Sequence, residues 1–161
     1  MRFDLYNKTS TRLPEAMFVA FDPTDASTPS ATGEGANNRS LWEMDVLGTW
    51  ISPTDVADGA AKGLHAIETG VRFSPGSESE LISSDPSGAF RGRLKIQSAD
   101  AALVRWGTPA PFPTPMLTPV DTAEGASFVL WDNLYNTNYV LWWPFMTQYE
   151  NVVFRFAISI E

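Results

Sequence analysis

The chain ends in the segment NVVFRFAISIE, positions 151–161, in which large apolar residues occupy every second position from 154 to 160 and Arg155, Ala157, Ser159 and Glu161 stand between and after them. Side chains two positions apart in a β-strand point to the same face of a sheet. The alternation therefore predicts a strand with one buried face, and it constrains the fold more than any other segment. The residues predicted to face the core are Phe154, Phe156, Ile158 and Ile160.

Other segments share this β-like character, and no window carries a sustained apolar repeat of helical period. The helix-tolerant segment 54–66 contains two glycines, which favour a short turn or coil. Eight or nine strands at a spacing of roughly 8–12 residues predict one all-β domain over residues 1–161, an antiparallel β-sandwich. Besides the terminal segment, the predicted strand regions are 2–7, 15–23, 41–52, 64–74, 90–98, 101–107, 127–133 and 139–145.

Two long loops interrupt this pattern. Residues 22–40 are rich in Pro, Gly, Ser, Thr and Asn, so we expect a polar excursion there. Residues 108–126 carry closely spaced prolines, which favour a stiff, extended backbone along the surface.

The charge of the chain excludes several partners. The formal net charge is −8, with 19 acidic and 11 basic residues, and no basic cluster could neutralise phosphates. We therefore expect neither nucleic acid nor an anionic membrane as a partner, whereas a neutral carbohydrate meets no such penalty. No stretch approaches the length of a transmembrane helix, the opening MRFDLYNKTS lacks the apolar run of a signal peptide, and nothing assigns a compartment.

The sequence offers little for catalysis. There is no cysteine and a single histidine, His65, for which a local structural hydrogen bond is the favoured interpretation. Glu43 and Asp45 have the spacing of two carboxylates on one strand face, and a solvated face is favoured over a glycosidase pair. We accordingly expect no catalytic residue, no metal site and no cofactor in this chain.

Aromatic and asparagine residues gather in the stretch SFVLWDNLYNTNYVLWWPF, positions 127–145. Sugar rings stack their C–H faces on aromatic rings, and planar amides both donate to and accept from their hydroxyls. The same composition also suits core strands joined by a turn, and both interpretations stay open. The candidate carbohydrate-binding residues are Asn133, Tyr135, Asn138, Trp142 and Trp143.

The same stretch, followed by NVVFRFAISIE, resembles the C-terminal end of the α-mannosidase-like glycoside hydrolases, family 38 and its relatives. In that family an aromatic strand is followed by Asn-Asn-Leu-Trp-Gly-Thr-Asn-Phe and a closing Arg-Phe-Arg-Phe strand. Asp132, Tyr135 and Asn136 depart from the pattern, standing where Asn, Trp and Gly are usual. The matching residues are Asn133, Leu134, Thr137, Asn138, Phe154, Arg155 and Phe156. Upstream, NKTSTRLPEAMFVAF, GTWISPTDVADGAAKGLHAIETGV and IQSADAALVRWGTPAPFPTP resemble a poorly characterised branch of the same group.

The resemblance implies a C-terminal β-sandwich of the galactose-mutarotase type. The family's catalytic acids and metal ligands lie in an N-terminal barrel that no part of this chain matches, so no catalytic role carries over. The leading hypothesis is a non-catalytic domain that supports a glycoside hydrolase-like protein and contacts carbohydrate. The alternatives are a stand-alone carbohydrate-binding module and a structural, protein-interacting sandwich, and a small carboxylate hydrolase ranks last. The expected partners are carbohydrate and either the missing catalytic domain or a second copy of the chain.

Overall fold

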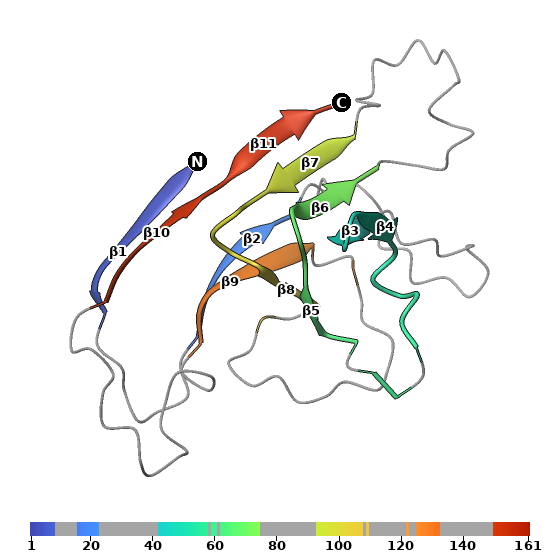
Figure 1. Cartoon of the computed structure of the whole chain (residues 1–161), viewed down its shortest axis with the longest axis horizontal. Helices are drawn as coiled ribbons and strands as arrows, with labels where there is room; N and C mark the ends of the chain where they lie inside the picture. Colours follow the sequence, from blue (N-terminus) through green and yellow to red (C-terminus); the bar gives the residue numbers. More distant parts are fainter. Residues whose placement is uncertain are drawn as a thin grey trace.

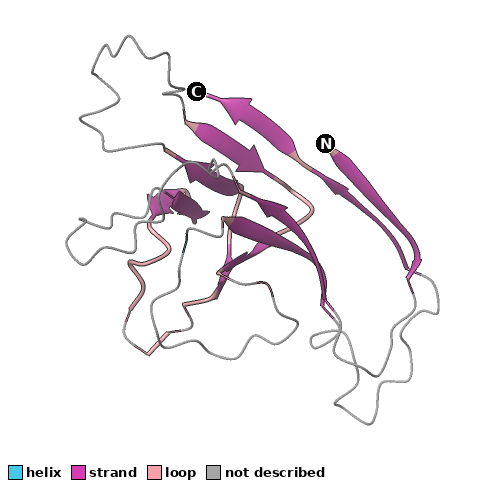
Figure 2. Ribbon diagram, turned by 180° about the vertical axis from the view of Figure 1, so that it is seen from behind, coloured by secondary structure: helices cyan, strands magenta, loops and turns pink. Residues whose placement is uncertain are grey.

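The computed structural model describes residues 1–8, 16–22, 42–57, 59–60, 62–74, 93–107, 109, 122, 125–132 and 150–161. Its described part consists of antiparallel strands, turns and loops, with no α-helix, which confirms the all-β prediction (Figure 2). No helix in these ranges could cross a membrane. The strands are β1 (Arg2–Lys8), β2 (Ala16–Phe21), β3 (Trp42–Val46), β4 (Thr49–Ile51), β5 (Leu64–Ala66), β6 (Gly70–Phe73), β7 (Leu94–Gln97), β8 (Leu103–Trp106), β9 (Ala126–Asp132), β10 (Glu150–Arg155) and β11 (Ala157–Ile160).

The described strands form three antiparallel sheets (Figure 1). One sheet has five strands in the order β11-β7-β6-β3-β4, and a second has four in the order β2-β9-β8-β5. The third sheet consists of β1 paired with β10. Because the chain passes between the two larger sheets after β2, β4, β5 and β7, strands far apart in sequence become neighbours.

The core lies between the five-stranded and four-stranded sheets. Trp42 on β3 and Trp106 on β8 are both almost fully buried, and their ring centroids are 5.5 Å apart. Alternate residues of β3, β6, β8 and β9 supply this layer, as expected for strands with one buried face. The buried cluster is Trp42, Met44, Ile67, Val71, Phe73, Ile96, Ala101, Val104, Trp106, Ala126, Phe128, Phe154 and Phe156.

The terminal segment behaves as one extended piece of chain that is interrupted at Phe156. Before the break β10 pairs with β1, and after it β11 pairs with β7 (Figure 1). The Phe156 ring lies 5.1 Å from that of Phe128, 5.6 Å from Phe21 and 5.9 Å from Phe3, measured between centroids. Phe156 therefore joins the β1–β10 ladder to the four-stranded sheet.

The prediction that this segment buries its apolar face is correct for its first half and wrong for its second. Phe154 and Phe156 are buried, at 6% and 4% exposure. Ile158 and Ile160 are 50% and 66% exposed. They lie beside Ile96 and Leu94 on the core-facing side of the sheet, but at the edge strand, where the packing of the core does not cover them.

The segment 41–52, predicted as one strand region, forms a hairpin. Its turn consists of Leu47 and Gly48, which have φ angles of 52° and 80°. Positive φ at both central residues matches the right-handed twist of a two-residue hairpin, as in a type I′ turn. Val46 then pairs with Thr49, and the two strands run antiparallel in the five-stranded sheet.

The segment 64–74 also divides into two strands, β5 and β6, which belong to different sheets. Residues 67–69 make the crossing, and the Ile67 N–H donates to Ala102 O at 2.9 Å. The second crossing, after β7, runs alongside it, with the Ser98 N–H donating to Thr69 O at 3.0 Å. In the described parts of 54–66, turns and coil precede β5, as the glycines indicated.

An ion pair fastens the crossing after β7 to β10. Arg155 Nη2 lies 2.7 Å from Asp100 Oδ1, and Arg155 Nε lies 2.8 Å from Asp100 Oδ2. The backbone N–H of Arg155 donates to the same carboxylate at 2.9 Å. These three hydrogen bonds hold the pKa of Asp100 at about 2, below its ordinary value of 3.8.

The predicted loops 22–40 and 108–126 lie almost wholly outside the described residues, as does the predicted strand 139–145.

Candidate functional site

The five residues predicted to bind carbohydrate lie outside the part of the chain that the structure describes. They are Asn133, Tyr135, Asn138, Trp142 and Trp143. The described portion of the same aromatic stretch ends at Asp132, and its Trp131 is 4% exposed. That tryptophan is therefore a buried residue of β9.

A second group of polar and aromatic side chains occupies the outer face of the five-stranded sheet. On β3, β6 and β7, residues of this face alternate with the buried Met44, Val71 and Ile96. Glu43 pairs with Arg72, and Arg72 in turn pairs with Lys95, so the three form a row across the sheet. The outer-face cluster consists of Glu43, Trp50, Arg72, Lys95 and Glu161.

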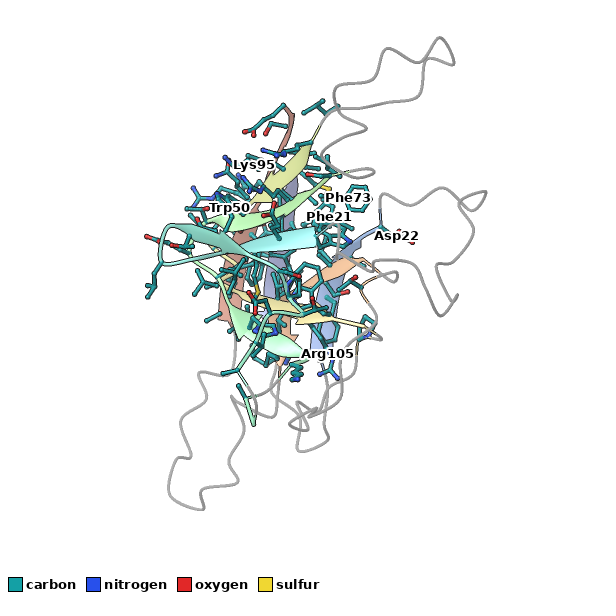
Figure 3. The ribbon with its side chains drawn as sticks, turned by 90° about the vertical axis from the view of Figure 1, so that its right-hand side faces the viewer. Phe21, Asp22, Trp50, Phe73, Lys95 and Arg105 are labelled. Atoms are coloured by element: carbon teal, nitrogen blue, oxygen red, sulfur yellow. The ribbon has the colours of Figure 1, made fainter. Side chains whose placement is uncertain are left out.

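Trp50 is the aromatic member of the cluster, and it is partly exposed. The guanidinium carbon of Arg72 lies 4.6 Å from the centroid of the indole, and Lys95 Nζ lies 5.7 Å from it. Figure 3 shows Trp50 and Lys95 together on one flank of the molecule. Because Trp50 belongs to β4 and these cations to β6 and β7, the contact reaches across β3, which lies between β4 and β6 in the sheet. Both cations lie within the distance at which the electron-rich face of an indole attracts positive charge.

The charges of the cluster are internally matched. Arg72 Nε donates to Glu43 Oε2, and Lys95 Nζ lies 3.4 Å from Glu161 Oε1. The side chains of Arg72 and Lys95 are 20% and 23% exposed, so the pairs lie at the surface. The cluster thus offers an aromatic ring with donors and acceptors beside it and no excess charge.

Glu43 and Asp45 both lie on the outer face, as their spacing predicted. The prediction that this face is solvated is wrong for Asp45. It is 5% exposed, and its two carboxylate oxygens accept from the Thr69 hydroxyl and from the Gly48 N–H, the latter at 3.0 Å. These bonds fix the β3–β4 turn to the crossing after β5. Both carboxylates are engaged in holding the sheet together.

His65 lies in β5, half-buried, with its Nε2 atom 3.0 Å from Lys62 O. This contact confirms the predicted local hydrogen bond. In the described ranges, no three side chains of His, Cys, Asp or Glu come together in a way that could hold a metal ion.

The outer-face cluster has the features of a carbohydrate-contacting surface. An indole offers a stacking surface to the C–H face of a sugar, and neighbouring carboxylate, guanidinium and ammonium groups can bond its hydroxyls. Comparison of the chain with protein families, curated proteins and solved structures found no match.

Sequence reasoning missed Trp50 because the hairpin turn reverses the alternation: even-numbered residues face the core before the turn, and odd-numbered residues face it after the turn. In one continuous strand over 41–52, Trp50 would share a face with Trp42 and Met44, which are core residues. The turn at residues 47–48 instead sets Ile51 opposite Met44 and Trp50 opposite Asp45, on the outer face. Gly48 was the one signal for this turn, since Leu47 stands where Asn or Asp is usual.

Proposed function

We propose that this chain is a non-catalytic β-sandwich domain, of the galactose-mutarotase type, from a glycoside hydrolase-like protein. Its role is to support that protein and to contact carbohydrate. The resemblance of the terminal strands to the α-mannosidase-like hydrolases supports the parent class. The observation that carries the contact with sugar is Trp50, a partly exposed indole on the outer face of the five-stranded sheet, with the cations of Arg72 and Lys95 over its ring.

The state of the carboxylates supports a role without catalysis. A glycosidase needs one carboxyl group to donate a proton and a second to act as nucleophile or base. Glu43 accepts from Arg72, while Asp45 is buried and accepts from Thr69 and Gly48. A carboxylate bound in this way stabilises the fold.

Two surfaces are proposed to contact the sugar. The first is the outer-face cluster. The second is the set predicted from the sequence, namely Asn133, Tyr135, Asn138, Trp142 and Trp143. Variants that remove one tryptophan at a time distinguish them.

Binding of mannose-containing oligosaccharides, followed by titration calorimetry and saturation-transfer NMR, tests the proposal. Because stacking on one aromatic ring contributes about 1 kcal/mol, Trp50→Ala is expected to weaken binding roughly fivefold. Trp50→Phe keeps a ring and should lose less. Leu47→Ala is the matched control, since it removes an exposed apolar side chain from the same hairpin but not from the outer face.

Binding that survives Trp50→Ala but is lost in Trp142→Ala or Trp143→Ala would move the contact to the predicted set. Absence of binding to every sugar tested would remove the carbohydrate part of the proposal. Hydrolysis of aryl-mannosides that disappears in Glu43→Gln would contradict the non-catalytic role.

A further inference from the structure

The arginine–carboxylate pair of the outer-face cluster leaves hydrogen-bonding groups unused. Arg155 binds Asp100 through both Nε and Nη2, whereas Arg72 donates to Glu43 through Nε alone. Within the described part of the chain, the Nη1 and Nη2 groups of Arg72 and the Oε1 atom of Glu43 have no hydrogen-bond partner. Arg72 and Glu43 therefore keep both donors and an acceptor for a ligand.

These unused groups lie beside the indole of Trp50. The guanidinium carbon of Arg72 is 4.6 Å from the centroid of the ring, and the same guanidinium binds Glu43. Trp50 is itself partly exposed. A sugar ring stacked on this indole would thus bring its hydroxyls within reach of Arg72 and Glu43.

Glu43 and Arg72 offer complementary hydrogen-bonding groups side by side. A carboxylate only accepts and a guanidinium only donates, while a hydroxyl does both. Two hydroxyls on adjacent carbons can bind to the pair together, one donating to Glu43 Oε1 and the other accepting from an Nη group of Arg72. Hydrogen bonds with charged groups of this kind are stronger than those between neutral groups.

The charge of the site disfavours an acidic ligand. Arg72 and Glu43 neutralise each other, and the side chain of Glu43 is more exposed than that of Arg72, at 31% against 20%. A ligand carboxylate that approached Arg72 would also meet the carboxylate of Glu43, and the net charge of −8 adds to the repulsion. A neutral ligand meets no such repulsion.

We propose that the outer-face cluster takes a neutral sugar that presents two free hydroxyls on adjacent carbons, a vicinal diol. Trp50 stacks on the C–H face of the ring, and Glu43 and Arg72 bind the diol. This inference rests on the proposed function, because it requires that the cluster contacts sugar. It adds the chemical class of the sugar and assigns to Glu43 a role in specificity besides its bond to Arg72.

NMR titration with the methyl glycosides of glucose, mannose and galactose tests the proposal. Each glycoside is compared with its monodeoxy derivatives, in which one hydroxyl is replaced by hydrogen. Removal of either hydroxyl of one adjacent pair is expected to weaken binding about fivefold, because a hydrogen bond to a charged group is lost. Removal of a hydroxyl outside that pair should change the affinity less than about twofold, since no such bond is lost.

Glu43→Ala tests which residue accepts from the diol. The variant lacks the acceptor, so the parent glycoside should bind to it about fivefold more weakly than to the wild type. The derivative that lacks the donating hydroxyl should bind equally to both proteins, because the bond is already missing. Asp4→Asn is the matched control, since it alters the carboxylate of another arginine pair, on β1, and should bind every sugar as the wild type does.

Methyl glucuronide tests the charge of the ligand. It carries a carboxylate where methyl glucoside carries a hydroxymethyl group, and it should bind more weakly than methyl glucoside at low salt. Binding of methyl glucoside should not change with salt concentration, because a neutral ligand adds no charge for salt to screen.

Circular dichroism shows whether each variant is folded, and the deoxy series decides on the wild-type chain alone if Glu43→Ala does not fold. Dependence on two adjacent hydroxyls, with equal binding of the deoxy derivative to wild type and Glu43→Ala, supports the proposal. Binding that Trp50→Ala weakens but that depends on no adjacent pair of hydroxyls overturns this inference and leaves the proposed function intact. Tighter binding of the glucuronide likewise overturns the inference alone, whereas absence of binding to every glycoside overturns both.

Discussion

Leu47 has a backbone conformation that is unfavourable for leucine. It has a φ of 52°, and its side chain is 89% exposed at the tip of the β3–β4 hairpin. A left-handed backbone costs an ordinary L-residue about 1–2 kcal/mol, and only glycine, asparagine and aspartate adopt it readily. Leucine gains no burial here that would offset this cost. The turn is held instead by Gly48, whose N–H donates to the carboxylate of Asp45.

Leu47→Asn is expected to stabilise the protein by about 1 kcal/mol, because asparagine tolerates the left-handed conformation. Denaturant unfolding measures the change. Gly48→Ala is the opposite control: open space surrounds the added methyl group, but the φ of 80° makes alanine strained. An unchanged stability in Leu47→Asn would show that the turn has a different backbone.

At the scale of elements, the sequence predicted where strands occur better than where they break. The terminal alternation continues without a flaw through Phe156, yet the chain leaves one ladder there and enters another. Alternation reports which side chains share a face, and it carries no information about which strand lies alongside or how far the core covers it. For this reason the burial of Phe154 was predictable and the exposure of Ile160 was not.

The ion pair between Asp100 and Arg155 makes one junction of elements sensitive to acid. The pKa of Asp100 is held at about 2 in the folded state, against an ordinary 3.8. Its contribution is therefore complete above that ordinary value, where the carboxylate is charged in both states. As the pH falls from about 4 towards 2, the unfolded chain binds the proton first, and the contribution is lost.

Unfolding free energies measured across this pH window, in wild type and in Asp100→Asn, test the assignment. Asp100→Asn should be less stable at neutral pH and should lose less of its stability on acidification. Parallel pH profiles for the two proteins would mean that another carboxylate is responsible.

At the scale of the whole molecule, the all-β class followed from composition and alternation, but the outer-face cluster did not. Trp50, Arg72 and Lys95 come from three strands, and their meeting depends on strand order and on the parity change at the hairpin. Neither is encoded in local periodicity. The carbohydrate site inferred from asparagine and aromatic content, residues 133–143, stays a prediction.

The hub of the molecule is Phe156, which contacts rings from β1, β2 and β9. Phe156→Ala removes a buried ring where three elements meet, so it is expected to cost about 3–5 kcal/mol of unfolding free energy. Ile158→Ala, two positions further along the terminal segment and half exposed, should cost less than about 1 kcal/mol. Denaturant unfolding of both variants provides the comparison. Equal losses of unfolding free energy would mean that Phe156 is not the centre of this packing.

The pairing of β1 with β10 joins positions as distant as Met1 and Phe156. During synthesis on the ribosome, β1 emerges well before β10, so it has no β10 to pair with while the residues between them are made. Until then the nascent strand offers Phe3 and Leu5 to any other surface in reach. A chaperone that shields β1 during this interval would act at the point where this topology is most vulnerable.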